Sequence, residues 1–128
     1  MADVPTFFRM NIEVVDLDAA QTFYETLFGA PGRLQAGSRF YLASGGVTFQ
    51  IVAVPNPHPA AKALYFTAKD LDALHARAAQ LNALSQDAVH GQIGGNVAVR
   101  PWGERSFYAQ DPWGNPLCFV EAGTTYPG

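Results

Sequence analysis

The tetrapeptide Asp-Leu-Asp-Ala occurs twice, at residues 16–19 and 70–73, and both copies stand in the same context. Each copy follows an apolar run typical of a strand (FFRMNIEVV and ALYFTAK), and each precedes apolar residues at helical spacing. Asp16 and Asp70 are suited to cap these helices, because a carboxylate accepts the unpaired amide hydrogens of a first helical turn. A coincidental match within a generic α+β domain is the alternative, but the order of elements agrees as well as the motif.

The segments after each helix extend the repeat. Three short apolar segments follow the first helix (GRLQ, RFYLAS, GVTFQIVAV), and three follow the second (NVAVRP, ERSFYAQ, PLCFVE). The chain therefore predicts an α+β fold with two tandem βαβββ modules, at about residues 5–54 and 62–122. A proline-rich linker, residues 55–61, joins them. At 128 residues the chain has the length of a single domain, residues 1–128. The glycine-rich segment 82–96 is expected to be a mobile loop.

Composition limits the binding partners and the cellular compartment that we expect for this chain. The formal net charge is −3 and no basic run occurs, which argues against nucleic acid as a partner. No apolar run approaches the roughly 20 residues that span a bilayer, so no membrane association is expected. One cysteine and the lack of a signal-peptide pattern in MADVPTFFRM favour a reducing, cytoplasmic location.

Two segments carry a resemblance to a known family. VVDLDAAQTFYETLFGA and PWGERSFYAQDPWGNPLCFVE resemble the vicinal oxygen chelate superfamily, which includes glyoxalase I, extradiol dioxygenases and bleomycin resistance proteins. The resemblance implies the glyoxalase/bleomycin resistance fold, in which the two modules form a curled mixed sheet around a cavity. It fixes no reaction, because function depends on the site and not on the fold.

The resemblance also identifies four positions that hold metal ligands in the metal-dependent members. They are occupied here by Arg9, Gln50, Ala63 and Cys118. Arg9 has no lone pair to offer and Ala63 has no donor, while one amide and one thiolate make a poor metal site. The three histidines, His58, His75 and His90, show no metal-ligand spacing. We therefore expect neither a metal nor another cofactor.

Strand alternation defines the candidate binding face. Arg9, Asn11 and Glu13 share one side of the first strand, and we place them toward the cavity. The same register places Tyr65 and Cys118 toward the cavity in module two. Two simpler interpretations stay open: this face is merely solvated, or Arg9 and Glu13 pair with each other.

The tripeptide Pro-Trp-Gly occurs twice and contains both tryptophans. The second copy, within residues 111–114, has the residues of a tight turn, so Trp113 is expected at an exposed tip. The resemblance to bleomycin resistance proteins implies that Trp102 forms one wall of a ligand crevice and that Phe40 or Tyr41 forms the other. Packing of Trp102 in the core or against a second subunit is the alternative.

Two functions follow as hypotheses. The first is a metal-free homodimer that binds or sequesters an aromatic or peptide-like small molecule, such as an antibiotic, in a crevice between subunits, and so confers resistance. The acidic balance of the chain would suit a cationic guest. The second is a lyase or isomerase, with or without a divalent metal, in which Glu13 acts as general base and Arg9 as oxyanion partner. A vestigial cavity is a third interpretation.

Overall fold

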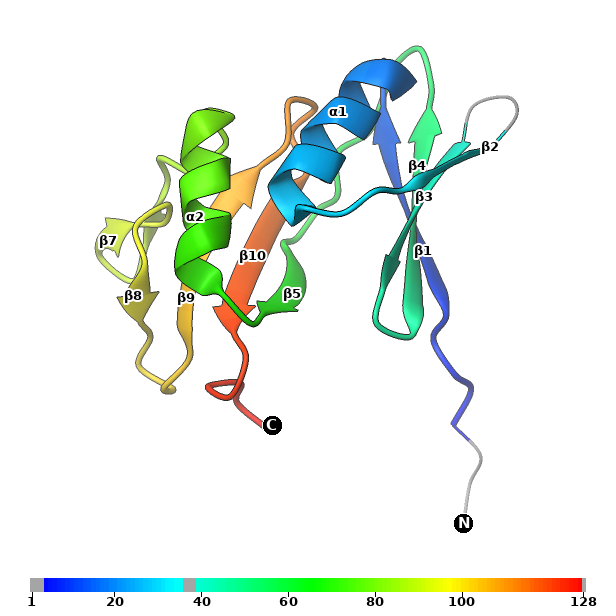
Figure 1. Ribbon diagram of the computed structural model, residues 1–128. Helices are drawn as coiled ribbons and strands as arrows, with labels where there is room; N and C mark the ends of the chain where they lie inside the picture. Colours follow the sequence, from blue (N-terminus) through cyan, green and yellow to red (C-terminus); the bar gives the residue numbers. More distant parts are fainter. Residues whose placement is uncertain (1–3, 36–38, 128) are drawn as a thin grey trace.

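The computed structural model describes residues 4–35 and 39–127, which repeat one order of elements twice (Figure 1). Module one comprises β1 (Arg9–Val14), α1 (Leu17–Phe28), β2 (Arg33–Gln35), β3 (Arg39–Ser44) and β4 (Val47–Ala53). Module two comprises β5 (Leu64–Ala68), α2 (Leu71–Gln80), β8 (Ala98–Val99), β9 (Arg105–Gln110) and β10 (Pro116–Glu121), with an inserted hairpin of β6 (Ala88–Val89) and β7 (Gln92–Ile93). The predicted α+β class and the βαβββ repeat are confirmed.

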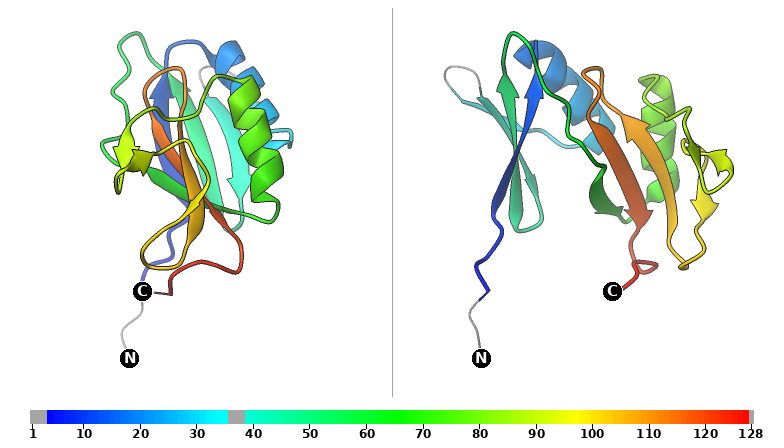
Figure 2. Two further views of the ribbon diagram at one scale, coloured as in Figure 1. Left: turned by 90° about the vertical axis from the view of Figure 1, so that its left-hand side faces the viewer. Right: turned by 180° about the vertical axis from the view of Figure 1, so that it is seen from behind.

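Each module forms its own four-stranded mixed sheet with the same topology. The strand orders are β1-β4-β3-β2 and β5-β10-β9-β8. The first strand of each module pairs in parallel with the last, and the remaining pairs are antiparallel. Strands β1 and β5 are therefore edge strands. The sheets stand apart at the end of the molecule that holds both termini, and α1 lies between them at the other end (Figures 1 and 2).

The repeated tetrapeptide caps both helices as predicted. Asp16 Oδ1 accepts a hydrogen bond from the Ala19 amide at 3.1 Å, and Asp70 Oδ1 accepts one from the Ala73 amide at 3.0 Å. Helix α1 ends at Gly29, whose φ of 68° lies in the left-handed region that glycine adopts without strain. No helix in the described part of the chain is long and apolar enough to cross a membrane.

The core lies where the helices meet the inner faces of the two sheets. Residues of both modules belong to one buried cluster, which includes Ile12, Val14, Tyr24, Leu27, Phe49, Ile51, Leu71, Leu74, Phe107, Leu117 and Phe119. An aromatic contact links the sheets directly, because the ring centroids of Phe49 on β4 and Phe66 on β5 lie 5.6 Å apart. The faces that carry these residues are called the inner faces below, and the opposite faces are called the outer faces.

The turn at residues 111–115 joins module two to module one. Its Asp111 side chain is buried and accepts hydrogen bonds from the Trp113 and Asn115 amides. Asp111 Oδ2 also accepts from the Tyr24 hydroxyl of α1 at 2.6 Å. Asn115 donates through Nδ2 to the Glu13 carbonyl of β1 at 3.1 Å. The turn predicted from sequence therefore also holds the two modules together.

Two expectations about loops need correction. Trp113 is half-buried against the core and is not an exposed tip. Segment 82–96 contains the β6–β7 hairpin and joins β9 through three backbone hydrogen bonds, from the Ser85 amide to Tyr108, from the Tyr108 amide to Gly94 and from the Gln110 amide to Ala83. Its Gly95 is buried so tightly that a Cβ there would lie 2.6 Å from the Ser85 carbonyl oxygen. The glycines of this segment serve close packing as well as turns.

Candidate functional site

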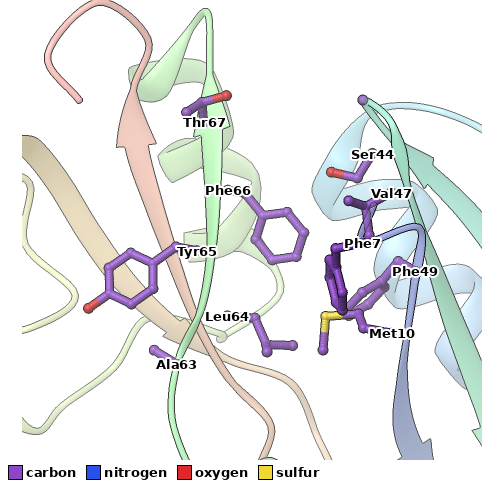
Figure 3. A pocket seen from close by; sticks show the side chains of 11 residues that line it. Phe7, Met10, Ser44, Val47, Phe49, Ala63, Leu64, Tyr65, Phe66 and Thr67 are labelled. Atoms are coloured by element: carbon purple, nitrogen blue, oxygen red, sulfur yellow. The ribbon is translucent and has the colours of Figure 1, made fainter. Parts of the chain in front are cut away.

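The outer faces of the two modules point away from each other within one chain. Phe49 and Phe66 meet across the gap between the sheets. Successive side chains of a strand alternate between faces, so Gln50 and Tyr65 point in opposite directions. Figure 3 shows Tyr65 directed away from the side on which Phe66 and Phe49 lie. The predicted site residues therefore form two half-sites, one on each outer face.

The outer face of module one carries a row of four polar side chains. The strand register aligns Asn11, Gln50, Tyr41 and Arg33 across β1, β4, β3 and β2. Gln50 is only 8% exposed, yet its amide forms no hydrogen bond with the described part of the chain. No fully buried side-chain N or O atom in the described residues lacks a partner, so the Gln50 amide must reach solvent. The guanidinium of Arg33 lies over the Tyr41 ring, 4.8 Å from its centroid. This half-site offers hydrogen-bonding groups beside an aromatic surface.

Two further predicted residues lie on strand β1. The Arg9 guanidinium lies 5.0 Å from the ring centroid of Phe8. Glu13 accepts a hydrogen bond from the His58 amide at 2.8 Å, and its carboxylate is 3.4 Å from His58 Nδ1. The backbone hydrogen bond from His58 lowers the pKa of Glu13. No ion pair between Arg9 and Glu13 forms within residues 4–35 and 39–127.

The outer face of module two carries the equivalent row, Tyr65, Cys118 and Tyr108. The two tyrosine hydroxyls lie 3.2 Å apart. Cys118 is fully buried, and burial raises the pKa of its thiol to about 11. The thiol therefore stays protonated near neutral pH, which makes it a weak nucleophile.

The residues predicted to form the two crevice walls lie in different environments. Phe40 is fully buried in the core, so its proposed role as a wall is wrong. Strand alternation turns Phe40 inward and its neighbour Tyr41 outward. Trp102 lies in the turn between β8 and β9, is 37% exposed, and stands outside the buried core. Its Nε1 donates to Glu104 at 2.7 Å, and its ring meets His90 edge-on at 5.0 Å.

A groove of about 680 Å³ separates the modules on their inner side (Figure 3). Phe7, Met10 and Phe49 face Leu64 and Phe66 across it. The lining is mainly apolar, and the edges of β1 and β5 border it. Monomeric proteins seldom leave such an apolar surface uncovered, so the groove is a candidate contact surface.

The donors at the family's metal-ligand positions do not fit a divalent cation. Arg9 offers no lone pair and Ala63 offers no donor, which leaves only the Gln50 amide and the Cys118 thiol. The histidines lie on separate elements: His58 is beside Glu13, His75 contacts the Gly95 carbonyl, and His90 is beside Trp102. Among the residues that the structure describes, no three His, Cys, Asp or Glu side chains gather as a metal site would require.

Sequence reasoning missed a signal that identifies the outward tyrosines. The corresponding strands β3 and β9 each contain a Phe-Tyr pair, at residues 40–41 and 107–108, whereas the Phe-Tyr pair at residues 23–24 lies in helix α1. In both pairs the phenylalanine is fully buried, and the tyrosine lies on the outer face beside Gln50 or Cys118. The repeat thus extends to the half-sites themselves.

Comparisons with known proteins agree with this architecture. The family model described as Glyoxalase/Bleomycin resistance protein/Dioxygenase superfamily matches residues 6–119. A glyoxalase/bleomycin resistance protein from Albidiferax ferrireducens T118 is 25% identical with a TM-score of 0.72, over 90% of this chain and 97% of that one. A lactoylglutathione lyase from Agrobacterium tumefaciens is 22% identical with a TM-score of 0.66, over 94% and 96%. A bleomycin-binding protein in complex with bleomycin is 18% identical with a TM-score of 0.65, over 92% and 98%. A search of curated proteins found no match.

Proposed function

The chain belongs to the glyoxalase/bleomycin resistance protein/dioxygenase superfamily, and on this premise we propose that it is a metal-free, non-catalytic homodimer that binds or sequesters an aromatic or peptide-like small molecule, such as an antibiotic. The proposal rests on the opposed outer faces of the two modules. Because one chain directs its half-sites apart, a crevice that contains both needs module one of one copy and module two of another. We also propose that the two modules form a single domain, which their common core supports, and that the protein is cytoplasmic, which its single cysteine supports.

Two features of the edges support assembly between copies. Strands β1 and β5 lack a neighbour on one side in the described chain, and unpaired edges are natural sites for pairing. The segment before β1 exposes Phe7 and Phe8, at 65% and 60%. Pairing of β1 with β5 of a second copy would cover these apolar residues and place the half-sites opposite each other.

The polar row of module one supports small-molecule binding. The Gln50 amide is largely buried but free to bond with a guest, and Asn11 and Tyr41 flank it. A buried polar group that gains a partner on binding contributes both affinity and orientation. Arg9, Tyr65 and the exposed side of Trp102 are further proposed contacts.

The alternative of a lyase or isomerase is less well supported by the geometry. A general base near neutral pH needs a raised pKa, whereas the hydrogen bond from His58 lowers the pKa of Glu13. The metal-ligand positions do not supply a divalent cation site either. Turnover of a 2-oxoaldehyde–thiol adduct that is lost in Glu13→Gln would nevertheless establish the enzyme.

Titration with a bleomycin-type glycopeptide tests the drug-binding form of the proposal. Calorimetry would measure binding, and single-tryptophan variants, Trp113→Phe and Trp102→Phe, would show which ring responds. We expect the fluorescence change in the variant that keeps Trp102. A change confined to the variant that keeps Trp113 would remove Trp102 from the site. An absence of binding at high micromolar concentration would exclude this class of drug.

Sedimentation of a matched pair of variants tests the dimer. Phe7→Glu places a charge in the apolar groove, whereas Val15→Glu places one on an exposed residue just after β1. Both side chains are exposed in one chain, so neither change should unfold it. We expect Phe7→Glu to sediment as a monomer and Val15→Glu as a dimer. A wild-type monomer at all concentrations would contradict the proposal.

A further inference from the structure

An arginine lies over a tyrosine at equivalent places on both outer faces. Tyr41 is next to Gln50 in module one, and Tyr108 is next to Cys118 in module two. The guanidinium carbon of Arg33 lies 4.8 Å from the Tyr41 centroid, and that of Arg100 lies 5.2 Å from the Tyr108 centroid. The two arginines belong to corresponding edge strands but to different points along them, because Arg33 begins β2 and Arg100 follows the end of β8.

Arg100 is a buried cation that forms no ion pair within the described residues. The residue is 3% exposed, and it donates to Ser106 through Nε at 2.9 Å and to the Ser106 carbonyl through Nη2 at 3.1 Å. Burial raises the pKa values of Tyr108 and Cys118, so neither is an anion near neutral pH. Burying a charge without a counter-ion is costly, so this face favours an added negative charge.

The nearby carboxylate of Glu104 is engaged elsewhere. It accepts from Trp102 Nε1 at 2.7 Å and from the Tyr126 amide at 2.8 Å. No carboxylate forms an ion pair with Arg100 in the part of the chain that the structure describes. The positive charge of Arg100 is therefore not neutralised by a direct contact there.

The hydroxyls beside Arg100 add a further donor. Tyr65 and Tyr108 share one hydrogen bond at 3.2 Å, in which one hydroxyl donates to the other. When Tyr108 is the donor, the hydroxyl hydrogen of Tyr65 is left for another acceptor. Tyr65 is 61% exposed, so this donor pair is reached from solvent, while Arg100 supplies charge at the base of the half-site.

We propose that the outer face of module two binds the carboxylate of an aromatic guest, with Tyr65 and Tyr108 as hydrogen-bond donors and Arg100 as the counter-charge. This inference rests on the proposed crevice and names the chemistry of its guest. Arg33 and Tyr41 of the facing copy provide a second cation and a ring surface on the other wall. The guest is then an anion, opposite to the expectation from the net charge of −3, because Arg100 is buried at this half-site without an ion pair among the described residues.

Three naphthalene probes of similar size that differ in charge test the charge preference: 2-naphthoate, 2-naphthylmethanol and 2-naphthylmethylammonium. Calorimetry on the wild-type protein should give an affinity for naphthoate at least about tenfold above that for the alcohol, with the ammonium weakest. Equal binding of all three, or tighter binding of the alcohol or ammonium, would overturn the carboxylate site while small-molecule binding stands. No binding of any probe at millimolar concentration would count against both.

Variants test which residues give rise to the preference for naphthoate over the other two probes. Tyr65→Phe changes an exposed residue, so it should fold normally, and it should reduce the naphthoate preference severalfold. Arg100→Gln should abolish the preference, and Arg100→Lys, which keeps the charge without the planar fork, should retain part of it. Lys62→Gln removes one exposed positive charge outside the half-sites and should change nothing. If Arg100→Gln does not fold, an unchanged preference in both Arg100→Lys and Tyr65→Phe would still refute the assignment.

Discussion

The two modules share an element order, a strand topology and a helix cap, but they differ in the turn that closes the last hairpin. In module two this turn is buried, and Asp111 and Asn115 connect it to α1 and β1. The corresponding turn of module one contains Gly45 and Gly46, which are exposed, and a Cβ at either would meet no atom within 4 Å. Duplication therefore supplies the framework, while one copy alone supplies the connection between modules.

The two modules should differ most in the stability that they lose when the side chain at this turn is removed. Asp111→Ala leaves the Tyr24 hydroxyl and two turn amides without their acceptor, and we expect a loss of about 3–5 kcal/mol in the free energy of unfolding. Ser44→Ala at the matching position of module one should change it by less than about 0.5 kcal/mol. Urea denaturation measures both. Similar losses would mean that the two turns contribute alike.

Tyr24 tests the module one side of the same connection. Tyr24→Phe removes one hydrogen bond to a charged acceptor, and we expect a loss of about 1.5–2 kcal/mol. Burial and the neighbouring Asp111 raise the pKa of Tyr24 well above its ordinary value. A raised folded pKa means that this stabilisation is complete below the unfolded pKa of about 10 and is lost as pH rises further.

The gap in unfolding free energy between wild type and Tyr24→Phe should therefore be constant at lower pH and should narrow above about pH 10. Denaturation curves at a series of alkaline pH values measure it. The comparison between the two proteins cancels the contributions of Tyr108 and Cys118, whose pKa values are also raised. A gap that widens above pH 10 would contradict the assignment.

Sequence reasoning succeeded for features that depend on local pattern. The caps at Asp16 and Asp70 and the repeated order of strands and helices follow from spacing along the chain. It placed Arg9, Asn11 and Glu13 on one side of the first strand, and the strand register aligns Asn11 with Gln50 of β4.

The same reasoning failed where distant segments meet. The choice between Phe40 and Tyr41 depends on which face packs against the helices, and the burial of Trp113 depends on the packing of its turn against the core. The stacking of Arg100 on Tyr108 depends on how the segment before β9 returns over the sheet. The opposed half-sites also depend on packing, because the inner faces meet at Phe49 and Phe66. Apart from the repeated Phe-Tyr pair of β3 and β9, none of these contacts leaves a signal in the sequence.

The helix caps, in contrast, should contribute equally to the free energy of unfolding in the two modules. Asp16→Ala and Asp70→Ala each remove one side-chain acceptor from a first helical turn, and each should cost about 1 kcal/mol. The two sites share no partner, so the double variant should lose about the sum. Thermal and urea unfolding measure these values. A much larger loss at one site would show that the repeated motif has diverged in role.

The smallest expected difference in unfolding free energy between the modules lies at the third residue of the Asp-Leu-Asp-Ala motif. Asp18 and Asp72 both stand in the first turn of a helix, where a carboxylate interacts favourably with the helix dipole. Asp72 also pairs with Arg105 at 2.8 Å, but its side chain is 72% exposed, so water and salt weaken the pair. Asp72→Asn should therefore lower the free energy of unfolding slightly more than Asp18→Asn, by less than the loss of a cap. The excess should disappear at high salt, because only the ion pair distinguishes the sites. An excess that persists in concentrated sodium chloride would mean that packing around Asp72, and not its charge, separates the two modules here.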